Sequence, residues 1–379
     1  MRTAATFALL LTGCLLAAGP RAAVLEDDRA DLMYHLYDGG GVRIDGPALL
    51  VRKKFEEKYA VSASYYVDMV SSASIDVVTT ASPYTEERTQ YGLGAEYLRG
   101  KSTYRLGFSN STENDYEADT ASIAISQDMF GDLTSLQLSF ARGWDKVFRR
   151  GDSAFSDRLD RRVYGVDLTQ VATKSLLLGL SWETITEEGF LNNPYRSVRY
   201  LDADAAAGFA FEPERYPRTR TGNALAARGR HFLPWRAAVQ LEYRWYTDSW
   251  GIRAHTAQLG YTHPVGPRLV LDAHYRWYTQ DAADFYADLF PRSNFQNFLA
   301  RDKELSTMSS QTIGVSASYE FSLPGADVFK KTTLNLKYDY ILFDYDDFRD
   351  LRVTGVPPGS EPLYKFNASV VQLFLSGWF

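Results

Sequence analysis

The sequence predicts an all-β fold, a transmembrane antiparallel β-barrel of about 16 strands with short periplasmic turns and long extracellular loops. Segments of roughly ten residues with alternating apolar and polar side chains recur along the chain. Aromatic residues make up 14% of the 379 residues, although the mean hydropathy is only -0.29. This combination is expected where one face of each strand meets lipid and the other meets water.

The first residues have the features of an export signal. A basic residue precedes an apolar run over residues 4–18, so we expect a signal peptide at 1–23 and a single barrel domain at 24–379. The segment before Cys14 also fits the box that precedes a lipidated cysteine, so two types of cleavage stay open. If Cys14 is removed with the signal, the mature protein has no cysteine and no disulfide.

The clearest strand is predicted over residues 269–278. Leucine, alanine and aromatic residues at odd positions alternate there with Asp272, His274 and Arg276, which gives one apolar and one polar face. By the same alternation, further strands are predicted at 31–37, 45–53, 59–70, 88–98, 101–109, 118–127, 133–144, 160–170, 175–186, 218–231, 237–246, 252–263, 306–322, 331–343 and 365–379.

The connections between these strands predict the orientation of the barrel. Bacterial barrels keep their short turns and both termini in the periplasm. The long connections are then extracellular, at 71–87, 145–159, 187–217, 281–305 and 344–364. The tight turns 39–41 and 248–251 occur on that same side and depart from the pattern. If the first hairpin lay outside the wall, about 14 strands would remain.

The last strand has the features of a closing strand. Apolar residues at odd positions over 371–379 end in a terminal aromatic residue, Phe379. Such an ending resembles the signal that the barrel-assembly machinery recognises, so we expect that machinery as a partner. A soluble open sheet is disfavoured because its apolar faces would need a covering layer that the chain does not encode.

Several segments resemble a known family. They are 65–84, 192–200, 213–220, 285–292 and 300–305, and they are similar to segments of a domain-of-unknown-function family of proteobacterial outer-membrane proteins. The resemblance covers about residues 31–379. It implies an exported barrel without an assigned substrate. It also implies genes nearby for a small lipoprotein, a thioredoxin-like protein and a flavin-transferring enzyme, which connects the family to a redox-linked envelope process.

Charged residues in the middle of strands are candidate lumen-lining residues. They are Arg228, Arg230, Glu242, Arg244, Asp272, His274, Arg276, Lys337 and Asp339. Mixed charge at this depth suits the selectivity lining of a channel. The alternative is that these groups pair across the wall and hydrate the interior. An arginine ladder over 215–230 likewise either attracts anions or neutralises carboxylates such as Asp167 and Glu183.

No motif for chemistry stands out. A barrel phospholipase needs a histidine and a serine two positions apart on a strand, and none of the 5 histidines has that partner. The acidic segment 344–350 lacks the ligand spacing of a calcium loop. We therefore expect no enzyme, no cofactor and no metal site. A net charge of -6 without a long basic run also argues against nucleic-acid binding.

Together these features predict a protein of the outer membrane of a Gram-negative bacterium. The leading hypothesis is a channel or an export or transport component with a charged lumen and an unknown small solute. The alternative is a barrel that anchors an assembly or binding component of an envelope system, with outer-membrane lipid and periplasmic proteins as partners. An outer-membrane enzyme is the least favoured of the three.

Overall fold

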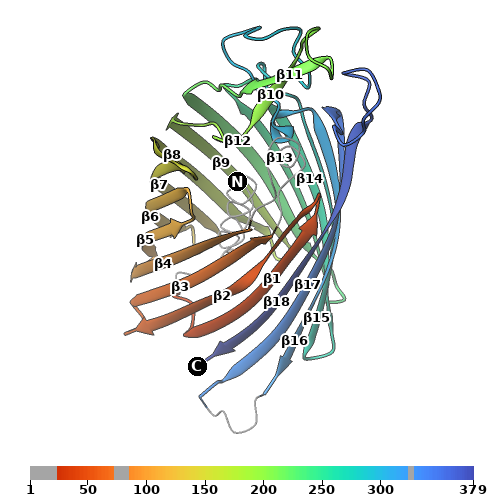
Figure 1. Cartoon of the computed structure of the whole chain (residues 1–379). Helices are drawn as coiled ribbons and strands as arrows, with labels where there is room; N and C mark the ends of the chain where they lie inside the picture. Colours follow the sequence, from red (N-terminus) through yellow and green to blue (C-terminus); the bar gives the residue numbers. More distant parts are fainter. Residues whose placement is uncertain (1–23, 72–84, 323–327) are drawn as a thin grey trace.

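The chain forms one closed barrel. The computed structural model describes residues 24–71, 85–322 and 328–379. In this part of the chain 16 antiparallel strands close on one another, and two short strands form a separate hairpin at the end with the long connections (Figure 1). The predicted fold class and strand count are confirmed. The predicted signal peptide 1–23, with Cys14, lies outside the described residues.

The strand boundaries are close to those predicted. The wall consists of β1 (Arg29–Gly39), β2 (Val42–Phe55), β3 (Tyr59–Ser71), β4 (Thr85–Arg99), β5 (Ser102–Thr112), β6 (Tyr116–Met129), β7 (Thr134–Arg149), β8 (Asp152–Thr173), β9 (Leu176–Gly189), β12 (Thr219–Phe232), β13 (Ala238–Asp248), β14 (Arg253–Val265), β15 (Leu269–Gln280), β16 (Met308–Phe321), β17 (Lys331–Arg349) and β18 (Leu363–Trp378). The separate hairpin is β10 (Ser197–Leu201) with β11 (Phe209–Pro213).

The first and last strands close the wall. β1 pairs with β18 from Arg29 opposite Trp378 to Gly39 opposite Ala368, and it pairs with β2 along its whole length as well. The first hairpin therefore belongs to the wall, and the alternative of about 14 strands is wrong. Beyond β18, the backbone N–H of Phe379 donates to the carbonyl of Asp28 at 3.2 Å. Because each edge of the described strands is paired, the closed wall has no open edge that would expose a row of unpaired backbone groups to lipid.

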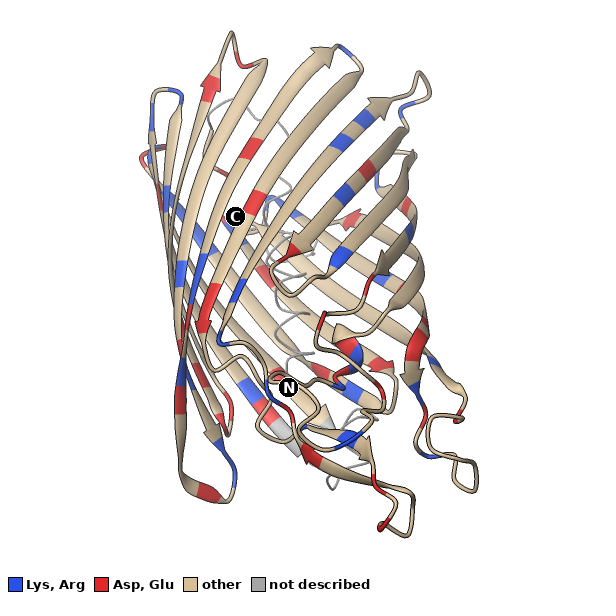
Figure 2. Ribbon diagram, turned by 90° about the horizontal axis from the view of Figure 1, so that it is seen from above, with Lys and Arg blue, Asp and Glu red and all other residues tan. Residues whose placement is uncertain are grey.

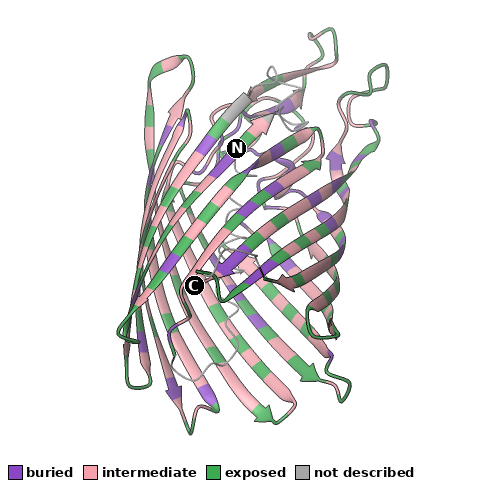
Figure 3. Ribbon diagram, turned by 90° about the horizontal axis from the view of Figure 1, so that it is seen from below, coloured by how far each residue is buried: buried purple, intermediate pink, exposed green. Residues whose placement is uncertain are grey.

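The two faces of the wall differ in chemistry. Exposed and less exposed residues alternate along the strands (Figure 3). The outward face presents large apolar side chains, such as Leu241 and Ile313, each 60% exposed, and Leu106, 59% exposed. An apolar surface of this extent is stable only against lipid. The polar residues of the alternation consequently point to the interior. No helix among the described residues is long and apolar enough to cross a membrane.

The connections correct part of the prediction. Those at the end with the C-terminus are short, as predicted, although residues 323–327 lie outside the described part. At the other end, the predicted long loop 145–159 is wrong, because β7 and β8 continue to a tight turn at 150–151. β17 likewise extends through most of the acidic segment. The long outer connections are 190–218, 281–307 and 350–362, while residues 72–84 lie outside the described residues.

Candidate functional site

The interior wall between β12 and β17 contains the predicted lumen-lining residues. Charged residues occur on strands all around the wall (Figure 2). On β15, Asp272, His274 and Arg276 alternate with exposed neighbours and so lie on the inner face. The same alternation puts the following residues on the inner face: Arg228, Arg230, Glu242, Arg244, Lys337 and Asp339. The arrangement is a polar surface of both signs that faces the lumen.

Two of the arginines reach across a neighbouring strand to a carboxylate. Arg228 of β12 lies 3.1 Å from Asp167 of β8, with β9 between them. Arg244 of β13 lies 3.2 Å from Glu183 of β9, with β12 between them. Arg230 donates to the Gln240 side chain at 2.6 Å. Within the predicted arginine ladder, Arg228 therefore neutralises a wall carboxylate, whereas Arg230 binds an amide.

A histidine and an aspartate meet across a glycine further along the same part of the wall, on β15 to β17. His274 of β15 and Asp339 of β17 both lie opposite Gly314 of β16, and the His274 Nε2 is 3.4 Å from the Asp339 Oδ1. Lys337 lies 2.9 Å from the other Asp339 oxygen. Because Gly314 has no side chain, the imidazole and the carboxylate can share the space above it. Asp272 accepts hydrogen bonds from neighbouring hydroxyl groups.

Glu242 and Arg276 differ from their neighbours in being unpaired. Neither side chain has a hydrogen bond or an ion pair with any residue in the described part of the chain, whereas the other charged groups nearby are paired. Gln258 lies opposite both of them, on the strand between. This row therefore presents one carboxylate and one guanidinium to the interior, two strands apart, which interact electrostatically but form no ion pair.

A second histidine and aspartate pair was missed by the sequence analysis. His35 of β1 lies opposite Gly46 of β2, and its Nε2 is 2.8 Å from the Asp68 Oδ1 of β3. The Tyr66 ring stacks on the imidazole at 4.9 Å. Arg88 lies 3.7 Å from the other oxygen of Asp68. The strand predicted at 31–37 continues to Gly39, and its alternation puts His35, next to the exposed Tyr34, on the inner wall.

The remaining histidines have tyrosine neighbours or none. His255 contacts the Tyr243 hydroxyl at 2.6 Å and His263 contacts the Tyr261 hydroxyl at 3.2 Å, both on the outward face. Within the described ranges, no histidine is hydrogen-bonded to a serine hydroxyl. In the same ranges, no group of histidine, cysteine and acidic residues has the geometry of a metal site.

A buried ionic network joins the three long outer connections. Arg199 of β10 is fully buried and donates to Glu361 at 2.6 and 3.0 Å and to Asp288. Asp288 also accepts from Arg301 at 2.8 Å and from the Arg349 backbone N–H at 3.1 Å. These pairs link segments 89 and 162 residues apart in sequence. Removing one member of a buried pair costs several kcal/mol, about 3–5, so the network holds the loops in one arrangement.

The electrostatics of this network fix its charge state. Burial acts to raise the pKa of Glu361, but hydrogen bonds from Arg199 and from the Gly359 backbone, together with the guanidinium charge, outweigh it. The pKa of Glu361 therefore lies below its ordinary value. For Arg199, burial acts to lower the pKa, and the two carboxylates raise it above the ordinary value. Both groups are charged at neutral pH.

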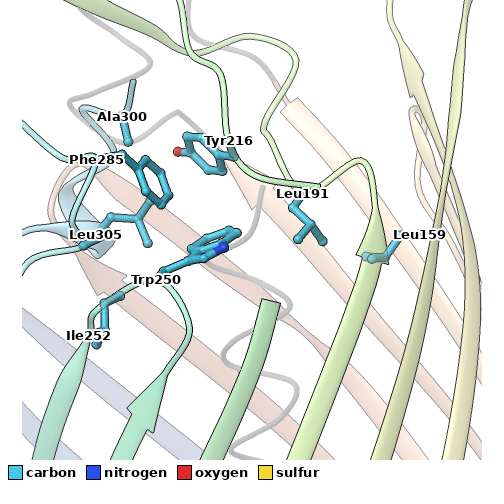
Figure 4. Packing of buried hydrophobic residues seen from close by; sticks show 9 residues of the cluster. Leu159, Leu191, Tyr216, Trp250, Ile252, Phe285, Ala300 and Leu305 are labelled. Carbon is cyan, nitrogen blue, oxygen red and sulfur yellow. The ribbon is translucent and has the colours of Figure 1, made fainter. Parts of the chain in front are cut away.

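An aromatic cluster supports the same loops (Figure 4). Trp250, in the turn between β13 and β14, is 2% exposed and packs edge-on against Tyr216 and Phe285, with ring centroids 5.5 and 5.2 Å away. Its indole N–H donates to the Thr219 carbonyl at 2.9 Å. Leu159 of β8 belongs to the cluster too. The short outer turn 248–251, which departed from the predicted pattern, thus packs against two of the long loops, 190–218 and 281–307.

Comparison with known proteins shows the family. Residues 75–346 match the family described as Protein of unknown function (DUF3570). The chain belongs to this family. The resemblance predicted from the sequence is confirmed, although the match begins later and ends earlier than about 31–379. No curated protein matches the chain.

Solved structures are similar in fold. A bacterial polysaccharide outer membrane secretin has a TM-score of 0.51 at 8% identity, covering 92% of this chain and 98% of that one. Outer-membrane expressed OmpT of Vibrio cholerae has a lower TM-score of 0.45 at 8% identity, covering 93% of this chain and 99% of that one. The P. putida toluene transporter TodX gives 0.44 at 10% identity, covering 97% and 94%. With its closed wall and apolar outer face, this family member is an outer-membrane β-barrel of a Gram-negative bacterium.

Proposed function

We propose that this barrel is a channel through which small polar solutes cross the outer membrane. The observation that carries the proposal is the unpaired Glu242 and Arg276 on the inner wall of a closed barrel of 16 strands. Barrels with 16 strands are wide enough to leave an aqueous channel. A wall charge without an ion-pair partner is retained at low cost only where water or a solute meets it, so these two groups mark the solute path.

The outer loops set the entrance to this path. Arg199, Glu361 and Asp288 hold the long connections together, and Lys303 of the connection 281–307 is buried and lies close enough to Tyr37 of β1 to interact electrostatically. A connection that starts at β15 and approaches β1 narrows the outer mouth, because three wall strands separate these two strands. Such a constriction restricts passage to small solutes.

Single-channel recording tests this function. We expect the purified, heat-modifiable protein to give stable conductance steps in planar bilayers. Glu242→Gln should shift the reversal potential in a salt gradient towards anion preference, because it removes a lumen carboxylate. Arg276→Gln should shift it towards cations. Lys365→Gln is the matched control, since Lys365 is 68% exposed and points outward. A folded barrel that never conducts would refute the proposal.

A second candidate function is favoured by the buried loop network. A barrel that anchors an assembly or binding component of an envelope system, redox-linked or not, needs a rigid surface outside the membrane. Arg199, Asp288 and Arg301 stabilise such a surface. A sealed barrel in which loop substitutions alter partner binding without changing the wall would support this candidate over the channel. We propose no catalytic activity and no cofactor.

A further inference from the structure

The outward face of β7 and β8 changes character along its length. Its middle is apolar, with Leu138 51% exposed and Tyr164 43% exposed. Towards the outer turn at 150–151, the same face presents four cations instead: Arg142, Lys146, Arg158 and Arg162. Their side chains point away from the lumen because Leu159, next to Arg158, is buried in the interior loop cluster. The cations therefore follow the apolar part of this face and lie towards the outer turn.

The register puts like charges opposite one another. Arg142 is paired in the ladder with Arg162, and Lys146 with Arg158. Like charges directly opposite on a sheet face destabilise the pair, and the low polarity near lipid adds to this cost. Two such pairs in succession on neighbouring strands are therefore unfavourable unless an anion lies between them.

The carboxylates on this face equal the four cations in number, but they are not paired with them one to one. Asp160 accepts from Arg142 at 2.6 Å and from Arg162 at 3.1 Å, so one carboxylate is shared by two guanidinium groups. Lys146 is neutralised by Glu117 at 3.0 Å. The Arg158 side chain has no hydrogen bond or ion pair with any described residue. Two further carboxylates, Asp119 of β6 and Glu188 of β9, flank this strip on neighbouring strands, and Glu188 lies opposite Asp160 rather than an arginine.

An aromatic side chain lies within the cation strip. Trp144 is opposite Asp160, between the two like-charged pairs, and is 43% exposed on the outward face. Tryptophan favours the membrane interface, where its ring packs against the lipid and sugar parts of headgroups while the indole N–H stays solvated. Arginine guanidinium groups bind phosphate oxygens through paired charge-assisted hydrogen bonds.

We propose that this face is a binding site for the phosphorylated sugar headgroup of an outer-leaflet glycolipid. Arg142 and Arg162 bind the phosphate, Arg158 adds a further cation, and Trp144 packs against the sugar. The occupant is a lipid rather than a soluble phosphate because the site is continuous with the apolar belt that contacts acyl chains. The inference rests on the location in the outer membrane and not on the channel function.

Native mass spectrometry of the full-length barrel tests the site. Bisphosphorylated lipid A is titrated against the wild type, the double variant Arg142→Gln/Arg162→Gln and the control Arg43→Gln/Lys365→Gln. The control removes two cations, 54% and 68% exposed, from the outward face of other strands at the same end. We expect about tenfold weaker lipid binding in the first double variant and no change in the control.

A second arm uses the wild type alone, so that a variant that fails to fold does not leave the question open. Dephosphorylated lipid A should bind about tenfold more weakly than the bisphosphorylated form. Heat-modifiable migration on gels checks that each variant is folded. Equal binding of the two lipids, or equal loss in the two double variants, would overturn the proposal.

Discussion

Replacing Gly314 by alanine probes the packing of the inner wall. A Cβ at Gly314 would lie inside contact distance of the His274 ring and of the Asp339 carboxylate, and 2.5 Å from the His274 Nε2. The imidazole and the carboxylate, now 3.4 Å apart, would have to separate. Forced repacking of this kind costs about 1–3 kcal/mol. The expected result is a lower midpoint urea concentration of unfolding, while the slope of the unfolding free energy against urea concentration stays the same.

Gly260→Ala is the matched control for this prediction. Gly260 lies opposite His274 on the other neighbouring strand, so both glycines flank the same ring. Its added Cβ would meet Gln240 at ordinary contact distances, 3.7 Å from the Cβ and 4.0 Å from the carbonyl oxygen. We expect its free energy of unfolding to stay within about 0.5 kcal/mol of the wild type. Tryptophan fluorescence during urea unfolding measures both variants. Equal stability of the two would refute the account of the shared space above Gly314.

Three further predictions concern the outer loops. Glu361→Gln should lower the free energy of local opening of the loops 190–218 and 350–362 by about 3 kcal/mol. Hydrogen exchange in these loops should become faster, while the wall strands keep their protection. Because the pKa of Glu361 is lowered by folding, its contribution is complete above the ordinary value of 4.5 and is lost as the pH falls below it, so acid should increase proteolysis of these loops. Trp250→Ala should lower the free energy of local opening of these loops by about 3–5 kcal/mol and leave the barrel heat-modifiable. Unchanged proteolysis of the loops would contradict each of the three predictions.

The wall could be predicted because its pattern is local. Alternation of side chains with period two is set by the strand itself, so the segment predicted at 269–278 is observed at Leu269–Gln280. The same rule put Asp272, His274 and Arg276 on one face. The segment 145–159 was wrongly predicted as a loop because its charged residues resemble a solvated connection. They belong to strands that continue beyond the apolar belt, where charge on the outward face is compatible with headgroups.

The loop network could not be predicted in the same way. Arg199 and Glu361 are 162 residues apart. Arg199 lies in the segment 192–200 that resembles the family, but nothing in that segment indicates Glu361 as its partner. Their pairing depends on the closure of the barrel, which brings the connections after β9, β15 and β17 to the same end. The pairing of His35 with Asp68 depends likewise on the register of β1 to β3 around Gly46. Single-strand periodicity contains no information about such contacts.

Cysteine accessibility tests the central claim, that solutes pass along the wall at Arg276. Arg276→Cys and Trp277→Cys are made in a Cys14→Ser background, and single channels are recorded before and after a cationic thiol reagent. Trp277 is the control because it is the next residue and is 38% exposed on the outward face. We predict that the reagent changes the conductance of Arg276→Cys and leaves that of Trp277→Cys unchanged. No change at position 276, or an equal change at both positions, would contradict the account.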